Sequence, residues 1–178
     1  IDNPCNNCGG AGKTQSNENV SVKIPKGVDD GTRIRIAGKG EAGTKGGSNG
    51  DLYLFVSVEP HDIFKRSEEN LFYELPVSFA DAALGATVEV PSIDGGKTKI
   101  KIPSGTQSGK QLRLRGKGMP VLKRNLFGDL YIRVVTEVPT SLTKRQKELL
   151  SEFKNLEDNK SNPLIKSFFD KAKKFWKQ

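Results

Sequence analysis

The chain contains one stretch of sequence twice, and this repeat constrains its fold more than any other feature. Residues Val22–Glu59 and Ile100–Glu137 align at a constant offset of 78 without a gap, and about sixteen of the thirty-eight aligned positions are identical. Both copies begin with [VI]-K-I-P-x-G, continue to G-K-G and then reach G-D-L-Y after a further nine residues. So long a match at one spacing predicts two related structural units in tandem.

Each copy has the pattern of β-strands joined by turns. Residues 22–24 and 34–36 alternate apolar and polar side chains, as do their equivalents in the second copy, and this is the period of a strand with one buried face. The glycines and the proline between them are typical turn residues. We therefore expect each copy to form a hairpin, then a long loop, then a third strand, which covers 52–58 in the first copy and 130–138 in the second.

Composition agrees with a protein made mainly of β-sheet. The chain has 178 residues, of which 34% are hydrophobic, and it contains 19 glycines and 9 prolines. This abundance of turn residues favours short strands over a helical bundle. No apolar run approaches the roughly 20 residues that span a bilayer. The fold class that we predict is two tandem, homologous β-sandwich-like domains, the first one truncated, followed by a C-terminal helical segment.

The second copy is preceded by a block, residues 64–99, that the first copy lacks. In it, residues 71–77 have the composition of a strand, and residues 87–90 and 97–102 read as a hairpin around Asp94-Gly-Gly. Between them, Ser78 as N-cap and Gly85 after the last turn bound a short helix. The block predicts a strand, a helix and a strand pair.

These patterns divide the chain into four parts. They are a cysteine-rich remnant at 1–13, an incomplete first β domain at 14–63, a second β domain at 64–138 and a helical segment at 139–178. We expect the block missing from the first domain to lie upstream of this chain. Apolar side chains of 20–63 that it would cover are then exposed.

The two cysteines lie in the pattern C-x-x-C-x-G-x-G, which places Cys5 and Cys8 three residues apart. Two thiolates on a tight turn supply half of a tetrahedral zinc site. A redox motif would need the start of a helix in a βαβ unit, and glycines follow here instead. His61 is the only histidine that could add a ligand. We expect Cys5 and Cys8 to hold zinc together with residues outside this chain, and no tight zinc site in this chain alone.

The last forty residues change in character and predict two helices. Thr143 and Gln146 have the spacing of a capping box, and Asn162-Pro163 is typical of a helix start. Ten basic and five acidic residues lie in 139–178, so this part carries +5 of the net charge of +8. This excess fits either a solvated helix face or contact with an acidic partner or nucleic acid.

The second helix repeats large apolar residues at helical spacing with lysines on the other face. A single helix at a chain end cannot bury such a stripe by itself, so the stripe packs either on a second chain or on its own domain. We predict dimerisation. The residues expected to carry it are Leu164, Ile165, Phe168, Phe169, Phe175 and Trp176.

Residues for catalysis are scarce. His61 is the only histidine, it follows Pro60 in a turn-like context, and no G-x-S-x-G motif is present. The glycine-rich loop that starts at Gly38 ends in Thr-Lys instead of Lys-Thr and is not followed by an apolar helix, as a phosphate-binding loop would require. We predict that the chain is not an enzyme.

Taken together, these motifs resemble the C-terminal part of the DnaJ co-chaperone family. The matching segments cover nearly the whole chain. They are C-x-x-C-x-G-x-G, V-x-I-P-x-G-V-x-x-G-x-R-I-R-I-x-G-x-G-E-A-G, G-D-L-Y, E-P-H-x-I-F-x-R, P-V-S-F-x-x-A-A-L-G, L-R-G-K-G-M-P and S-F-F-D-K-A-K-K-F.

The resemblance implies a chaperone fragment that binds non-native polypeptides and forms a homodimer. In the intact protein it implies delivery of these clients to the partner ATPase DnaK, zinc at the cysteine repeats, and a location in the cytoplasm. An unfolded client would add a strand to an open sheet edge and place an apolar side chain in a pocket. Ile34, Ile36 and Phe64 are the candidates for this contact, although each also fits an ordinary core position.

The alternative function is a nucleic-acid-binding β protein, which the net charge of +8 suggests. Single-stranded nucleic acid is usually bound by exposed aromatic residues next to a basic groove. The sequence places its C-terminal lysines opposite the aromatic stripe and indicates no exposed stacking residues. We therefore expect clients and DnaK as partners, and neither nucleic acid nor a membrane.

Overall fold

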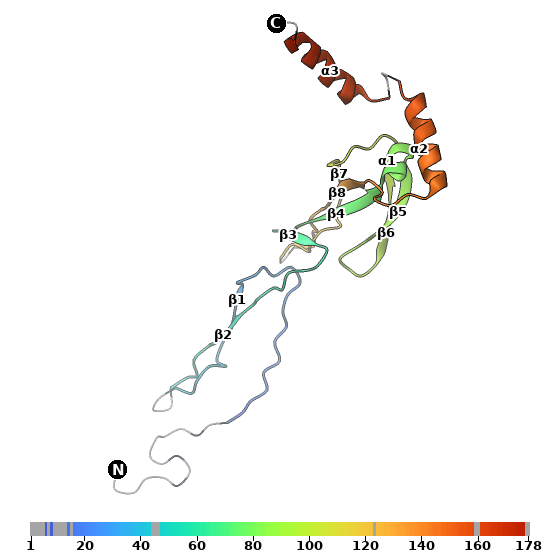
Figure 1. Ribbon diagram of the computed structural model, residues 1–178. Coiled ribbons are helices and arrows are strands. Elements are labelled where there is room, and N and C mark those ends of the chain that lie inside the picture. Colours follow the sequence, from blue (N-terminus) through green and yellow to red (C-terminus); the bar gives the residue numbers. More distant parts are fainter. Residues whose placement is uncertain are drawn as a thin grey trace. The chain divides into compact units, whose positions relative to one another are not determined.

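The computed structural model describes residues 6, 8, 14, 16–43, 47–122, 124–158 and 161–176. The chain divides into two compact units, Ile1–Thr136 and Glu137–Gln178. Among the described residues the first unit consists of β-strands and one short helix, and the second is helical (Figure 1). The predicted fold class, mainly β with helices at the C-terminal end, is confirmed in this form.

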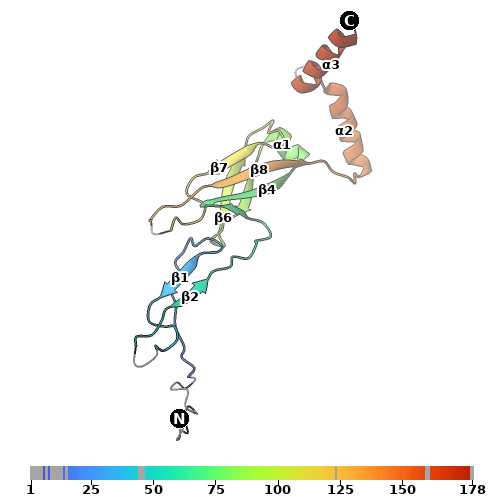
Figure 2. The same ribbon diagram turned by 90° about the vertical axis from the view of Figure 1, so that its left-hand side faces the viewer.

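Two sheets form the second β module, and in the larger one β4 and β8 run parallel, since Phe72 lies beside Tyr131 and Glu74 beside Arg133. One has four strands in the order β3-β4-β8-β7 and the other pairs β5 with β6. In Figure 2, β7, β8 and β4 lie side by side and β6 lies behind them. The strand bounds are Lys65–Ser67 for β3, Asn70–Ser78 for β4, Ala86–Pro91 for β5, Lys97–Ile102 for β6, Gln111–Leu114 for β7 and Leu130–Glu137 for β8.

The main core lies between these two sheets. Alternate residues of β4 and β8 point into it, as the period of two requires, and Ile102, Ile132 and Val134 have no exposed surface. The main cluster of buried side chains comprises Phe64, Leu71, Tyr73, Val90, Ile100, Leu130 and Ile132. The second module thus has the two layers expected of a small β-sandwich.

The predicted helix between the sheets is present as α1 (Phe79–Leu84). The hydroxyl oxygen of Ser78 accepts a hydrogen bond from the N–H of Asp81, as an N-cap does. Gly85 ends the helix at φ 85°, and a Cβ there would lie 2.9 Å from the nitrogen of Ser104. The sharp turn from α1 into β5 therefore requires glycine.

The first copy of the repeat contributes β1 (Arg33–Ile36) and β2 (Leu52–Phe55), which pair with each other. Ile34 lies opposite Leu54, and at the offset of 78 Leu112 lies opposite Ile132. The segments around the two equivalent glycines also agree. The carboxylate of Asp51 accepts from the N–H of Gly38 at 3.0 Å, and that of Asp129 accepts from the N–H of Gly116 at 2.8 Å.

The predicted hairpin within each copy is wrong. In the second copy, Lys97–Ile102 pairs with β5, whereas Gln111–Leu114 pairs with β8 in the other sheet. The eight-residue connection 103–110 is longer than most hairpin loops, and its backbone is held by α1, where Gly105 donates to Ala83 O at 3.1 Å. The connection 103–110 therefore crosses from the sheet of β5 and β6 to the four-stranded sheet.

The same pairing rule explains why residues 22–24 do not form a strand. Their equivalents, 100–102, are a strand because β5 precedes them and pairs with them. The described part of the first copy contains no such partner strand, and 22–24 have no regular structure. Side chains of residues 20–63 are accordingly exposed, among them Tyr53 and Phe55.

The second unit consists of α2 (Lys144–Leu156) and α3 (Pro163–Trp176). Thr143 and Gln146 form the predicted capping box, and α3 begins at Pro163 as expected. Neither helix buries any of its described residues. Among the described residues, no helix has both the length and the apolar character needed to cross a membrane.

Candidate polypeptide-binding edge

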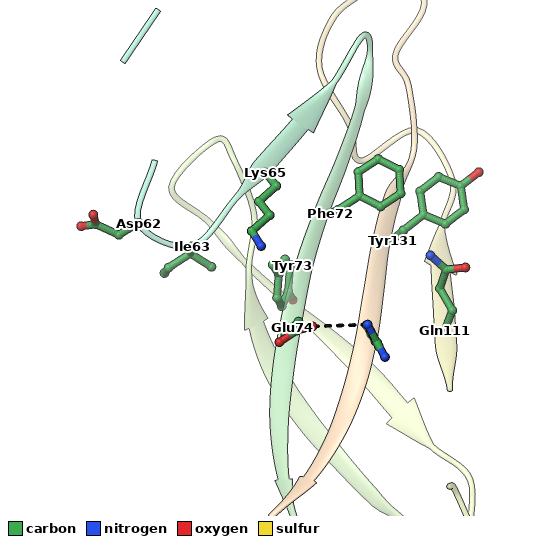
Figure 3. A pocket seen from close by; sticks show the side chains of 9 residues that line it. Asp62, Ile63, Lys65, Phe72, Tyr73, Glu74, Gln111 and Tyr131 are labelled. Atoms are coloured by element: carbon green, nitrogen blue, oxygen red, sulfur yellow. Dashed lines mark ion pairs between the residues drawn. The ribbon is translucent and has the colours of Figure 1, made fainter. Parts of the chain in front are cut away.

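A hollow of about 560 Å³ lies beside strand β4, at the edge of the four-stranded sheet (Figure 3). We call it the edge hollow. Phe72 of β4 and Tyr131 of β8 stack here with their ring centres 5.1 Å apart and nearly parallel. Glu74 and Arg133 form an ion pair at 3.6 Å next to them. The lining residues are Asp62, Ile63, Lys65, Phe72, Tyr73, Glu74, Gln111, Tyr131 and Arg133.

Strand β4 is longer than the edge strand that covers it. β3 pairs only with Asn70–Phe72, so the part of β4 from Tyr73 onward has no described strand on that side. The N–H of Leu71 donates to the oxygen of Asp129, the residue before β8, at 2.9 Å. Because backbone groups alternate sides along a strand, the N–H and C=O of Glu74 point to the uncovered side.

His61 prevents the chain before β3 from covering this edge. If the pairing of Lys65 with Phe72 continued, Ile63 would lie opposite Glu74. Instead the N–H of Ile63 donates to Nδ1 of His61 at 3.0 Å, and the N–H of Phe64 donates to the same atom at 3.3 Å. The side chain thus folds Asp62 and Ile63 into a turn, as the sequence indicated for His61.

Backbone groups that no described strand pairs, beside a hollow lined partly by aromatic side chains, are features that can recognise an extended peptide. The peptide can pair with the free N–H and C=O of Glu74, and one of its side chains can enter the hollow. Pro76 lacks an N–H and therefore limits such pairing to the first part of the uncovered edge. The edge hollow can bind a polypeptide by strand addition.

Phe64, one of the predicted client-binding residues, lies in the core. Only 7% of its surface is exposed, and its ring packs edge-on against Tyr73 and His61 at centroid distances of 5.4 and 5.1 Å. Its neighbour Ile63 is 48% exposed and lines the edge hollow. The structure therefore places the accessible apolar side chain one residue before the predicted one.

Ile34 and Ile36, the other predicted contacts, lie on β1 and face the same side as Leu52 and Leu54 of β2. All four side chains are half-buried. The edge hollow is not lined by either isoleucine, so the structure does not bring the three predicted residues together at one site.

The burial of Tyr73 beside the edge hollow has an electrostatic consequence. Its side chain is 5% exposed, and its hydroxyl has no hydrogen-bond partner among the described residues. Burial disfavours the phenolate and raises the pKa of Tyr73 to about 12. The residue therefore stays neutral at physiological pH and contributes no charge to the hollow.

Comparison with known families identifies the chain. The model of a family described as "DnaJ C terminal domain" matches residues 7–139, and that of the "Chaperone protein DnaJ C-terminal region" matches residues 145–178. The chain belongs to the DnaJ C-terminal domain family. The family match covers both copies of the repeat and the edge hollow, and the second match covers α2 and α3.

Two relatives of this DnaJ-family chain align with nearly its whole length. The chain is 67% identical over 177 residues to "Chaperone protein DnaJ" of Pelagibacter ubique, and 56% identical over 177 residues to the protein of that name in Cereibacter sphaeroides. These alignments cover 99% of this chain but 47% and 46% of those proteins. The chain therefore spans about half the length of the relatives that it matches.

The predicted zinc ligands of this DnaJ-family chain are only partly described. Cys8 is a free, half-buried thiol, whereas Cys5 lies outside the described residues. No group of three or more His, Cys, Asp or Glu side chains able to hold a metal ion is present among the residues that the structure describes. Because a structural zinc site needs four ligands, the described residues do not form one.

The predicted dimerisation residues all lie on α3, within the part that matches the DnaJ C-terminal region. Phe168 and Phe169 contact each other edge-on at 5.5 Å, but each stays about half exposed or more. The exposed fractions are 73% for Leu164, 56% for Ile165, 66% for Phe168, 49% for Phe169, 76% for Phe175 and 73% for Trp176. These side chains form one uncovered apolar face.

Sequence reasoning missed Phe72 and Tyr131 as parts of a site. Both occupy the outward positions of strands whose alternate residues, Leu71 and Ile132 among them, are buried. An aromatic residue at an outward strand position is a signal that the alternation itself contains. What the sequence could not show is that β3 begins only at Lys65 and so leaves this part of β4 uncovered.

Proposed function

We propose that this chain binds non-native polypeptides at the free edge of β4 and its edge hollow. The observation that carries the proposal is the backbone of Glu74, whose N–H and C=O face the side that β3 leaves uncovered, next to the exposed Ile63. Membership in the DnaJ family supports it. In the intact protein, binding would hold clients before their transfer to DnaK and would prevent their aggregation.

A substitution in the edge hollow tests this proposal. Ile63→Ser removes an exposed apolar contact, and because burial of such a side chain contributes about 1.5–3 kcal/mol, we expect affinity to fall at least tenfold. Binding is measured by fluorescence anisotropy with a labelled, reduced and alkylated protein that cannot refold. Leu84→Ser is the matched control, because Leu84 is 81% exposed on α1 and does not line the hollow. Equal affinities of the two variants would reject the site.

Nucleic acid remains the second candidate, because one expectation about it is wrong. Aromatic side chains do lie exposed beside basic ones: Tyr53 and Phe55 are 46% and 74% exposed, and the guanidinium of Arg33 lies 5.3 Å from the ring centre of Tyr53. A steep loss of oligonucleotide binding with salt, together with loss in a Phe55→Ser variant, would favour this function.

For the metal, we propose that Cys5 and Cys8 supply two of the four ligands of a zinc ion in the intact protein. Two thiolates leave half of the tetrahedral shell to other ligands, and the described residues offer no cluster that completes it. We therefore expect a chelator to leave the melting temperature of this chain unchanged. A fall in that temperature on adding the chelator would show that this chain alone holds a structural metal.

A further inference from the structure

The two copies of the repeat carry loops of the same length, and an equivalent backbone hydrogen bond frames each loop. The loops differ in polarity. In the first, the N–H of Gly40 donates to Gly50 O at 2.8 Å, and in the second the N–H of Gly118 donates to Gly128 O at the same distance. The loop between them reads EAGTKGGSN at residues 41–49 and MPVLKRNLF at residues 119–127. The frame therefore accepts a polar, glycine-rich loop as well as an apolar one.

The apolar side chains of the second loop are not buried by the fold. Leu126 is 58% exposed and Phe127 is 57% exposed, and Leu122 is 38% exposed. Since the first loop keeps the same frame without any large apolar residue, framing the loop does not require these three. Exposed apolar side chains that the fold does not need commonly mark an interaction surface.

Leu126 and Phe127 border a second hollow, which we call the loop hollow. Its volume is about 840 Å³, and it lies between the second loop, the turn that joins β5 to β6, and the segment before β1. The turn contributes Ile93, itself 39% exposed. Gly27 closes one side, where a Cβ would lie 2.2 Å from Pro120 O, so the backbones approach closely. The hollow is thus built by three segments that pack on one another.

The charge around the loop hollow is positive. Lys26 and Arg124 line it, and neither forms an ion pair with a described residue. Asp94 is its only described acidic lining residue. The carboxylate of Asp94 already accepts from the N–H of Gly96 at 3.0 Å, and that bond, with Lys117 nearby as a weaker cause, lowers its pKa. Asp94 therefore stays ionised, and the described lining carries two cations, Lys26 and Arg124, against this one anion.

We propose that the loop hollow docks an acidic segment of a partner protein that carries a bulky apolar residue. The apolar residue packs against Leu126 and Phe127, and acidic residues beside it face Lys26 and Arg124. This site is separate from the edge hollow, with which it shares no lining residue. Positive potential next to an apolar pocket selects acidic segments over neutral ones and speeds their association.

The test uses the whole 178-residue chain and three labelled synthetic peptides. One alternates Glu with Leu and Phe, one replaces each Glu by Lys, and one replaces each Leu and Phe by Ser. We expect the chain to bind the first peptide at least tenfold more tightly than either of the others, as measured by anisotropy. Equal binding of the Lys peptide would overturn the acidic partner, and equal binding of the Ser peptide would overturn the apolar anchor.

A loop-exchange variant replaces part of the second loop by the equivalent residues of the first. In this variant residues 121–127 are replaced by the sequence of 43–49, while Met119 and Pro120 stay, because Met119 packs against the core. We expect binding of the acidic peptide to fall at least tenfold with little change in melting temperature. A milder variant, Arg124→Glu, keeps Leu126 and Phe127. It should lose the preference for the acidic peptide over the Lys peptide. Unchanged binding in both variants would reject the site.

Two comparisons separate this site from its alternatives. Binding of the reduced and alkylated protein should not change in the loop exchange, and a parallel loss would show that the loop belongs to the general polypeptide site instead. Leu84→Ser, outside the hollow, should leave binding of the acidic peptide unchanged, and a fall there would show non-specific apolar adhesion. Displacement of the peptide by generic single-stranded DNA at physiological salt would make the site a nucleic-acid site and overturn the proposal.

Discussion

The hydroxyl of Tyr73 is buried and has no hydrogen-bond partner among the described residues, and its pKa rises to about 12 because burial disfavours the phenolate. In the unfolded chain the pKa of tyrosine is about 10. Between these values the unfolded state releases the proton and the folded state keeps it. The folded protein therefore loses stability as the pH rises from about 10 towards about 12.

Replacing Tyr73 by phenylalanine should remove this alkaline loss. Near neutral pH we expect Tyr73→Phe to be as stable as the wild type or up to about 1 kcal/mol more stable, because an unpartnered buried hydroxyl is costly. Above pH 10 the wild type should lose roughly 1 kcal/mol per pH unit relative to the variant. Urea unfolding of both proteins on either side of pH 10 measures the difference, and parallel pH profiles would contradict it.

His61 holds the turn that keeps the β4 edge open, because its Nδ1 accepts from the N–H groups of Ile63 and Phe64. Replacing it by alanine leaves both donors without this acceptor, so we expect His61→Ala to cost about 0.5–1.5 kcal/mol of unfolding free energy. Amide exchange at Ile63 and Phe64 should quicken. His61→Asn, which retains a short acceptor, is the control, and an equal loss in that variant would show that the ring contact with Phe64 matters more.

At the scale of the elements, the two copies differ in what supports them. Gly128 lies against the turn between β3 and β4, where a Cβ would come within 2.0 Å of Glu69 O. Its equivalent, Gly50, would place a Cβ 3.7 Å from the nearest backbone atom, an ordinary contact. The described part of the first copy has no counterpart of the β3–β4 turn, and this explains the difference.

These two glycines make a matched pair of substitutions. Gly128→Ala should lower the free energy of unfolding by about 1–3 kcal/mol, because a methyl group that overlaps backbone atoms forces the turn to move. Gly50→Ala should change it by less than about 0.5 kcal/mol. Urea unfolding of the two variants measures both values. Similar losses at the two positions would show that the copies are supported alike.

Most elements were predictable because their signals are local. The strand composition of 71–77, the hairpin around Asp94-Gly-Gly, the N-cap Ser78 and the capping box at Thr143 each depend on a few neighbouring residues, and each is found in the structure. Strand partners were not predictable in this way. Ile100–Ile102 pairs with β5 instead of β7, and this depends on how the 103–110 connection packs against α1.

The site was less predictable than the fold for the same reason. Alternation shows that Phe64 and Ile63 face opposite sides, but only the folded chain shows which of them is accessible. The free edge at Glu74 arises because His61 turns the chain away before β3 begins. An absence of pairing leaves no local signal in the sequence, so the edge hollow could be found only in three dimensions.

At the scale of the whole molecule, the described residues of the second unit include large apolar side chains that are exposed. Leu149 and Phe153 of α2 are 47% and 48% exposed, and the whole apolar face of α3 is exposed. The capping box at Thr143 stabilises the start of α2, and Pro163 at the first position of α3 favours that start, despite this exposure. Surface of this kind favours association with another chain over a solvated monomer.

We expect two copies of the chain to pair through the apolar face of α3. Burial of an aromatic side chain contributes about 2–3 kcal/mol. In a symmetric dimer the apolar face of α3 in one copy packs against the same face in the other. Phe168→Ser should therefore weaken the dimer at least thirtyfold, because two copies of the residue are lost in a symmetric interface. Sedimentation equilibrium over a range of concentrations gives the dissociation constants of wild type and variant.

The matched control for this dimer is Lys174→Ser, which alters the opposite, basic face of the same helix and should leave the dissociation constant within about threefold. If α3 instead packed on its own chain, the wild type would sediment as a monomer at every concentration, and Phe168→Ser would lower the melting temperature without changing the molecular mass. A concentration-dependent dimer that Phe168→Ser leaves intact would place the contact outside this face. Only dissociation confined to the apolar variant supports pairing through α3.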